Sequence, residues 1–169
     1  MPRIEIEAVG YGYNHLSVPE QGGVQLRRGA KSSGPCEVNI NCEEGDAWQN
    51  QKKGVCHTVQ RIGTKSYICT GSLVNNTAQD LYVLTAMHCS TEKNTEASDE
   101  NMKQWVFYFH MEQSGCSTSS PAVGSKTLTG CKRMAYTLTN GQSDGLLLLL
   151  NTQVPENYNV YYNGWDRRN

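Results

Sequence analysis

From Gly54 onward the chain consists of short runs of β-branched and aromatic residues, interrupted at close intervals by turn-forming residues. Residues of the first kind favour strands, whereas Gly, Pro, Asn and Ser favour turns. We expect strands at Val55–Ile62, Lys65–Val74, Leu81–Thr85, Trp105–His110, Lys126–Leu138 (one strand or two) and Leu146–Leu150. Six short strands and no convincing helix predict an all-β chain, either a small antiparallel barrel or a sandwich.

The sequence divides into an N-terminal segment, a central part that holds the strands, and a C-terminal tail. Residues 1–35 are rich in Gly and charge, and we expect a leader or a propeptide remnant there, with one short strand at Ile4–Val9. Residues 36–150 hold the strands, and the polar segment Ser90–Lys103 is predicted to be a surface loop. Residues 151–169 form a tail whose four aromatic side chains indicate that it packs on another surface.

Composition excludes several classes of function. The 169 residues suit one domain, and a net charge of −1 gives no basic face for nucleic acid or for an anionic membrane surface. The longest apolar run, Leu146–Leu150, is far too short to span a bilayer. No apolar signal segment follows Met1. We therefore expect neither a nucleic-acid partner nor a membrane partner.

The chain has seven cysteines, an odd number. None of them belongs to a C-x-x-C pair, so a structural zinc site is not expected, and neither a metal nor a cofactor is predicted. Widely spaced cysteines in such a chain favour disulfides formed in an oxidising compartment, which predicts a secreted or periplasmic protein. With seven cysteines, one must stay free or bond outside this chain.

Two residues stand where a fold can aim them at each other. His88 lies three positions after the strand-forming run Tyr82–Thr85, and Asp144 precedes the apolar run Leu146–Leu150. A histidine at a strand end has its ring positioned by the fold, as a general base requires. A carboxylate can hold the Nδ1–H of such a ring and fix its tautomer. Taken singly, each residue is more simply a surface histidine or an aspartate in a turn.

Taken together, the motifs resemble those of chymotrypsin-like serine proteases. Cys69-Thr70-Gly71-Ser72-Leu73 precedes Leu84-Thr85-Ala86-Met87-His88-Cys89, and Asp144-Gly145-Leu146-Leu147 follows later. The similarity is closest to the bacterial lysyl endopeptidase branch and extends over residues 33–169. The further stretches that carry it are Ser33-Gly34-Pro35-Cys36, Asn41-Cys42-Glu43-Glu44-Gly45-Asp46, Asn75-Asn76-Thr77 and Gly164-Trp165-Asp166-Arg167-Arg168.

The resemblance implies a fold and a set of roles. It implies a six-stranded antiparallel Greek-key barrel, the first barrel of a trypsin-like two-barrel fold. It assigns His88 as the general base and Asp144 as the residue that orients it. It also implies the disulfides Cys69–Cys89 and Cys42–Cys116, and in this branch the cysteine at position 36 bonds to the second barrel, which leaves Cys36 unpaired here. Cys56 and Cys131 have no counterpart, and we predict that they pair across neighbouring strands.

The sequence departs from the family in one major respect. No Gly-x-Ser-Gly turn follows Asp144, so the nucleophilic serine of a Ser-His-Asp mechanism is absent from this chain. We therefore expect the N-terminal part of a secreted serine endopeptidase that acts on polypeptides, and the resemblance implies a preference for Lys or Arg. We expect it to be inactive alone, with residues 151–169 crossing toward the missing C-terminal barrel. The alternative is a non-catalytic pseudo-protease or protein-binding barrel. Met87 before the histidine and Gly145 after the aspartate also differ from the family pattern.

Overall fold

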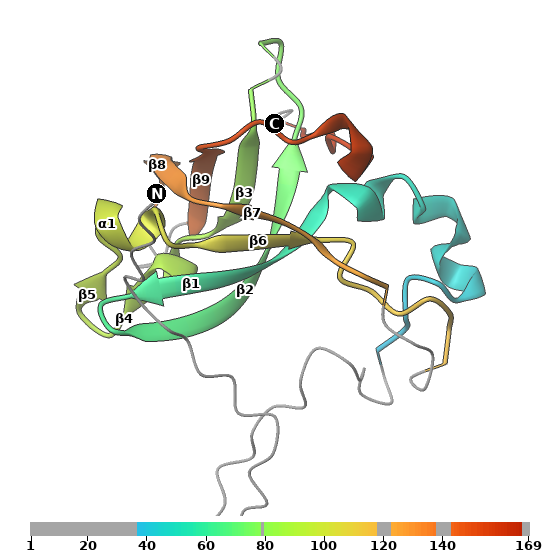
Figure 1. Ribbon diagram of the computed structural model, residues 1–169, viewed down its shortest axis with the longest axis horizontal. Coiled ribbons are helices and arrows are strands. Elements are labelled where there is room, and N and C mark those ends of the chain that lie inside the picture. The colour runs from blue at the N-terminus through green and yellow to red at the C-terminus, as the bar shows by residue number, and fades with distance from the viewer. Residues whose placement is uncertain (1–36, 79, 118–122, 138–142, 167–169) are drawn as a thin grey trace, which may run out of the picture.

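A curled antiparallel sheet of seven strands dominates the computed structural model, which describes residues 37–78, 80–117, 123–137 and 143–166 (Figure 1). Its strands are β1 (Val55–Ile62), β2 (Lys65–Val74), β3 (Tyr82–Ala86), β6 (Val106–Phe109), β7 (Lys126–Thr129), β8 (Cys131–Tyr136) and β9 (Gly145–Leu150). Their order across the sheet is β7-β6-β1-β2-β3-β9-β8. The prediction of a mostly β chain is confirmed.

The two edge strands of this sheet, β7 and β8, are consecutive in the chain. β7 pairs with β6, β8 pairs with β9, and only Gly130 lies between β7 and β8. Gly130 has a positive φ of 86°, a conformation that glycine adopts without steric cost. Its N–H donates to the Trp105 carbonyl at 2.8 Å, and its own carbonyl accepts from the Asn151 N–H at 3.1 Å. The stretch expected at Lys126–Leu138 is thus two strands that serve opposite ends of the same sheet.

The core lies on the concave side of the sheet. β1 and β9 each bury alternate residues, because side chains on a strand alternate between its two faces. Phe107, Phe109 and Trp105 are fully buried in this core. The run Leu146–Leu150 is continuously apolar in sequence, yet Leu147 and Leu149 are only partly buried, whereas Leu146, Leu148 and Leu150 are buried.

The segment predicted as a surface loop has more structure than expected. It holds the two-stranded ribbon β4 (Thr91–Glu92) and β5 (Thr95–Glu96), followed by the short helix α1 (Asp99–Met102). Ser98 caps this helix in a reciprocal capping box with Asn101. Met102 is buried in the core, so this segment covers one end of the sheet rather than lying free in solvent.

Four 3-10 turns complete the described structure: η1 (Glu43–Trp48), η2 (Gln51–Gly54), η3 (Met87–Ser90) and η4 (Glu156–Tyr158). The C-terminal stretch returns to the sheet, where Asn163 bridges Val74 of β2 in parallel. Tyr158 and Tyr162 pack against the core, and Tyr158 donates to the Thr127 carbonyl at 2.8 Å. Among the described helices, none is long and apolar enough to cross a membrane.

The structure corrects one predicted disulfide. Cys56 on β1 and Cys131 on β8 are both free thiols buried in the core. They cannot pair across neighbouring strands, because β6 and β7 separate β1 from β8 on one side and β2, β3 and β9 on the other. Cys36 and the short strand expected at Ile4–Val9 lie outside the described residues.

Candidate active site

His88 and Asp144 come from two adjacent strands. β3 pairs with β9 so that Ala86 lies opposite Gly145, which brings the residues beyond these two strand ends side by side. His88 lies in η3, the 3-10 turn that follows β3, and Asp144 directly precedes β9. The fold therefore unites two residues that lie 56 positions apart in the sequence.

Asp144 binds the histidine at two points. Its Oδ2 lies 2.6 Å from the Nδ1 of His88, and its Oδ1 accepts a hydrogen bond from the backbone N–H of His88 at 2.9 Å. A backbone hydrogen bond from Met87 N–H to the Asp144 carbonyl, at 3.0 Å, further ties η3 to the start of β9. Because the carboxylate accepts from both ring and backbone, it fixes the position and the orientation of the imidazole together.

The charge state of the aspartate follows from these contacts. The hydrogen bond from the His88 side chain, followed by that from the His88 backbone, lowers the pKa of Asp144 below its usual value of 3.8. The carboxylate is therefore ionised near neutral pH. An ionised acceptor at Nδ1 places the ring proton on that nitrogen and leaves the lone pair on Nε2.

The backbone of Asp144 has an uncommon conformation. Its φ of 47° lies in the left-handed region, which few residues other than glycine adopt and which Asp and Asn tolerate best. Thr137 stabilises this turn from the neighbouring segment, since its Oγ1 accepts from the Gly145 N–H at 2.7 Å and lies 3.0 Å from Ser143 Oγ. Thr137 could not be identified from the sequence, because no spacing rule marks a threonine that acts through another residue's backbone.

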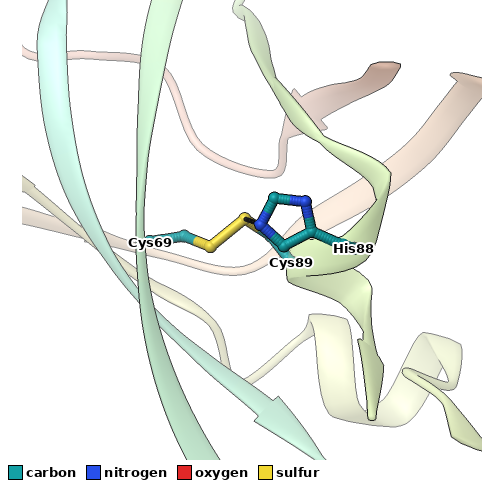
Figure 2. A group of neighbouring side chains, drawn as sticks. All are labelled: Cys69, His88 and Cys89. Atoms are coloured by element: carbon teal, nitrogen blue, oxygen red, sulfur yellow. Dashed lines mark hydrogen bonds between the residues drawn. A yellow bond between two sulfur atoms is a disulfide. The ribbon is translucent and has the colours of Figure 1, made fainter. Parts of the chain in front are cut away.

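A disulfide fixes the other side of the histidine turn. Cys69 on β2 is bonded to Cys89, the residue after His88. Figure 2 shows the bridge beside the imidazole, with Cys89 Sγ 3.8 Å from Nε2. A second bridge joins Cys42 to Cys116, so the structure forms both disulfides that the resemblance implied. Two disulfides are consistent with an extracellular location.

The two departures from the family pattern are accommodated. The Met87 side chain is 2% exposed, and its carbonyl accepts from Ser90 Oγ at 2.9 Å, so the larger residue fills the core beneath the turn. Gly145 begins β9, and a Cβ there would lie 3.3 Å from Thr137 Oγ1. Neither residue displaces His88 from Asp144.

A groove of about 360 Å³ lies beside the imidazole. Its walls include Tyr67, Ile68, the Cys69–Cys89 bridge, His88 and Glu92. Ile68 is 61% exposed, an unusual position for a large aliphatic side chain. The groove offers an apolar surface next to the nitrogen that carries the lone pair.

The other histidines lie apart from this site. His57 and His110 line a second groove of about 360 Å³ together with Lys52 and Glu112, which form an ion pair at 3.0 Å. His110 Nε2 lies 2.6 Å from the Tyr158 carbonyl, and burial lowers the pKa of His57. Both are explained by packing, while His15 lies outside the described residues.

A histidine oriented through Nδ1 by an ionised aspartate has a geometry suited to proton transfer at Nε2. Comparison with known proteins identifies the family of the chain. The family model described as "Lysyl endopeptidase, C-terminal domain" matches residues 30–169. The chain belongs to this family.

A curated relative extends the comparison. The lysyl endopeptidase of Pseudomonas aeruginosa is 27% identical over 146 residues, which are 82% of this chain and 30% of the relative. The chain thus spans less than a third of the length of that protein. The family description names a C-terminal domain of lysyl endopeptidase. That this chain forms the first of two barrels in the protease fold remains a prediction.

Proposed function

We propose that this chain supplies the general base and its orienting carboxylate to a serine endopeptidase of the Ser-His-Asp type. The observation that carries the proposal is the 2.6 Å contact between His88 Nδ1 and Asp144 Oδ2, reinforced by the 2.9 Å hydrogen bond from the His88 backbone. In this mechanism the base takes a proton at Nε2 and the aspartate stabilises the imidazolium that results.

Each residue then has one task. The Nε2 lone pair of His88 removes the proton from an attacking serine hydroxyl and later gives it to the leaving amine. Asp144 keeps the ring in the required tautomer and balances its positive charge without taking the proton itself. The serine and the oxyanion-hole amides would come from polypeptide outside this sequence, so we expect no hydrolysis by residues 1–169 alone.

The curled sheet supports a finer proposal for the fold. We interpret β7 and β8 as one long strand kinked at Gly130, which pairs with β6 at one end and β9 at the other. The sheet would then close into a six-stranded Greek-key barrel, the first of two barrels. Residues 151–169 would lead to the second barrel, which is the partner we propose for this chain.

The substrate we propose is a polypeptide. The groove of about 360 Å³ beside His88 would receive residues on one side of the scissile bond. The name of the Pseudomonas aeruginosa relative points to cleavage at lysine, and we propose a preference for Lys or Arg on that basis. With two disulfides among the described residues, we propose a secreted or periplasmic location.

The test uses the whole product of the gene. Peptide amides with Lys, Arg or a neutral residue before the reporter group measure hydrolysis and preference. We expect His88→Ala to lower kcat by about 10⁶-fold, and Asp144→Asn to lower it by about 10⁴-fold. His57→Ala is the matched control, because His57 lies in the other groove and should leave kcat unchanged.

Two results would overturn the proposal. Undiminished hydrolysis by the His88→Ala variant would exclude the imidazole as base. A whole gene product that binds peptides but hydrolyses none of them would favour the alternative, a non-catalytic protein-binding domain.

A further inference from the structure

Three potential metal ligands converge at the disulfide beside His88 (Figure 2). The sulfurs of Cys69 and Cys89 and a ring nitrogen of His88 all lie within 4.8 Å of one another. In the observed state the two sulfurs are bonded to each other. A disulfide sulfur is not the thiolate that binds metals, so the oxidised cluster is no metal site.

We propose that reduction of Cys69–Cys89 by a dithiol converts this cluster into a binding site for Zn²⁺ or another thiophilic divalent ion. The reductant supplies two electrons and two protons, the S–S bond breaks, and the dithiol leaves as its own cyclic disulfide. Metal binding then displaces both thiol protons, so one Zn²⁺ replaces two H⁺ on the sulfurs. His88 Nε2 is the third ligand.

The observed spacing suits such a site. Zinc lies about 2.3 Å from sulfur and about 2.0–2.1 Å from nitrogen, so tetrahedral ligands stand roughly 3.5 Å apart for a sulfur and a nitrogen and roughly 3.8 Å for two sulfurs. The Cys89 Sγ to His88 Nε2 distance is already 3.8 Å. The Cα atoms of Cys69 and Cys89 are 6.2 Å apart, which allows side-chain rotation to separate the two sulfurs while the backbone stays in place.

Asp144 prepares the imidazole for this role. Metal-binding histidines commonly donate their other ring N–H to a carboxylate, which fixes the tautomer and strengthens the ligand. Here Asp144 Oδ2 lies 2.6 Å from Nδ1, so the lone pair on Nε2 faces the sulfur side. The imidazole side chain is 64% exposed, which gives the ion access and leaves a fourth position for water.

The site would have a regulatory consequence, and this consequence rests on the proposed function. A metal on Nε2 occupies the same lone pair that the general base uses. Thiols stay reduced in the cytosol and oxidise after export, so the metal form belongs to the chain before its disulfides form. Metal binding itself requires no catalytic role for His88.

The experiment titrates the reduced full chain with Co²⁺, which reports thiolate ligands through sulfur-to-cobalt charge-transfer absorption. We expect the reduced chain to bind one equivalent of Co²⁺ with this charge-transfer absorption. The oxidised chain should show no such absorption. Asp144→Asn should weaken binding by about 10–100-fold, because it removes the carboxylate behind the ligand. His88→Gln should weaken it at least as much, and Cys69→Ser should abolish the two-thiolate spectrum.

Controls separate the folded site from adventitious thiol binding. The Cys42→Ser/Cys116→Ser variant lacks the other disulfide pair and should bind cobalt as the unaltered chain does. If the reduced chain unfolds, Asp144 lies 56 residues from His88 and cannot affect the affinity. Equal affinity in the unaltered, Asp144→Asn and His88→Gln chains would therefore overturn the proposal, as would a reduced chain without charge-transfer absorption. Because this readout requires no hydrolysis, it fails or succeeds independently of the proposed protease activity.

Discussion

Removing the Cys69–Cys89 disulfide should destabilise the fold by an amount set by the loop that it closes. The two cysteines lie 20 residues apart. For a loop of that length, the chain-entropy relation gives a loss of about 3.3 kcal/mol in the free energy of unfolding, because the unfolded chain regains the freedom that the bridge removed. For a chain of this size, such a loss lowers the melting temperature by about 10 °C.

The Cys42–Cys116 disulfide provides an internal comparison. Its cysteines lie 74 residues apart, so the same relation gives a loss of about 4.4 kcal/mol. Urea unfolding measured without reductant should therefore show a smaller loss of stability in Cys69→Ala/Cys89→Ala than in Cys42→Ala/Cys116→Ala. The single variant Cys69→Ala also opens the first loop, so its difference from the double variant isolates the packing of the buried Cys89 sulfur.

The result that refutes this reasoning is specific. A loss below about 1 kcal/mol for Cys69→Ala/Cys89→Ala would show that the bridge does not restrict the unfolded chain as the loop length requires. The reasoning would also fail if, after the packing of Cys89 is subtracted, opening the 20-residue loop lowered the free energy of unfolding more than opening the 74-residue loop.

Three further predictions concern the site and the core. The pKa of Asp144 is lower in the folded chain than its usual 3.8, so its stabilising contribution is fully present above that pH and is lost as pH falls through the lower folded-state pKa. Unfolding measurements should therefore show the unaltered chain and Asp144→Asn converging in stability only below pH 3.8, and a constant difference throughout the acid range would contradict this. Burial raises the pKa of Cys56 and of Cys131 to about 12, so neither thiol should react with a thiol reagent at neutral pH until the chain is denatured, and rapid labelling of both in the native chain would refute their burial. Gly71→Ala should cost about 1–3 kcal/mol in the free energy of unfolding, because the new Cβ would lie 2.6 Å from Cγ1 of the fully buried Val83, whereas Gly63→Ser, at a position with no heavy atom within 4 Å, provides a control for backbone strain alone.

Strand positions could be predicted where the residues carry the preference themselves. β1 and β2 match the predicted ranges Val55–Ile62 and Lys65–Val74 because β-branched residues and flanking turn residues define both ends locally. The order of strands across the sheet could not be predicted in that way. It depends on which strands pair over long sequence separations, as β3 does with β9.

The helix α1 was missed because its local signal is weak. A four-residue helix has no apolar periodicity, and its capping box uses Asn101 in place of the usual Glu or Gln. The buried Met102 at its end depends on tertiary packing against the core, which a polar, acidic sequence does not reveal.

The site was predicted through resemblance rather than through spacing. Nothing in the residues between His88 and Asp144 indicates that the two meet, whereas the ordered motifs place both on strand ends. Where the resemblance had no counterpart, the prediction was wrong: Cys56 and Cys131 are small apolar core residues rather than a disulfide. Thr137 illustrates the opposite case, since its role at the Asp144 turn depends on two hydrogen bonds that only the folded chain reveals.

The proposed function depends most on an imidazole held at Nδ1 by an ionised carboxylate, and ¹⁵N NMR of the His88 ring measures this directly. We predict a proton on Nδ1 that is hydrogen-bonded to Asp144, shifted far downfield and protected from exchange. In Asp144→Asn that downfield proton should disappear. A ring proton located on Nε2 instead of Nδ1, or a spectrum unchanged by Asp144→Asn, would contradict the proposed function.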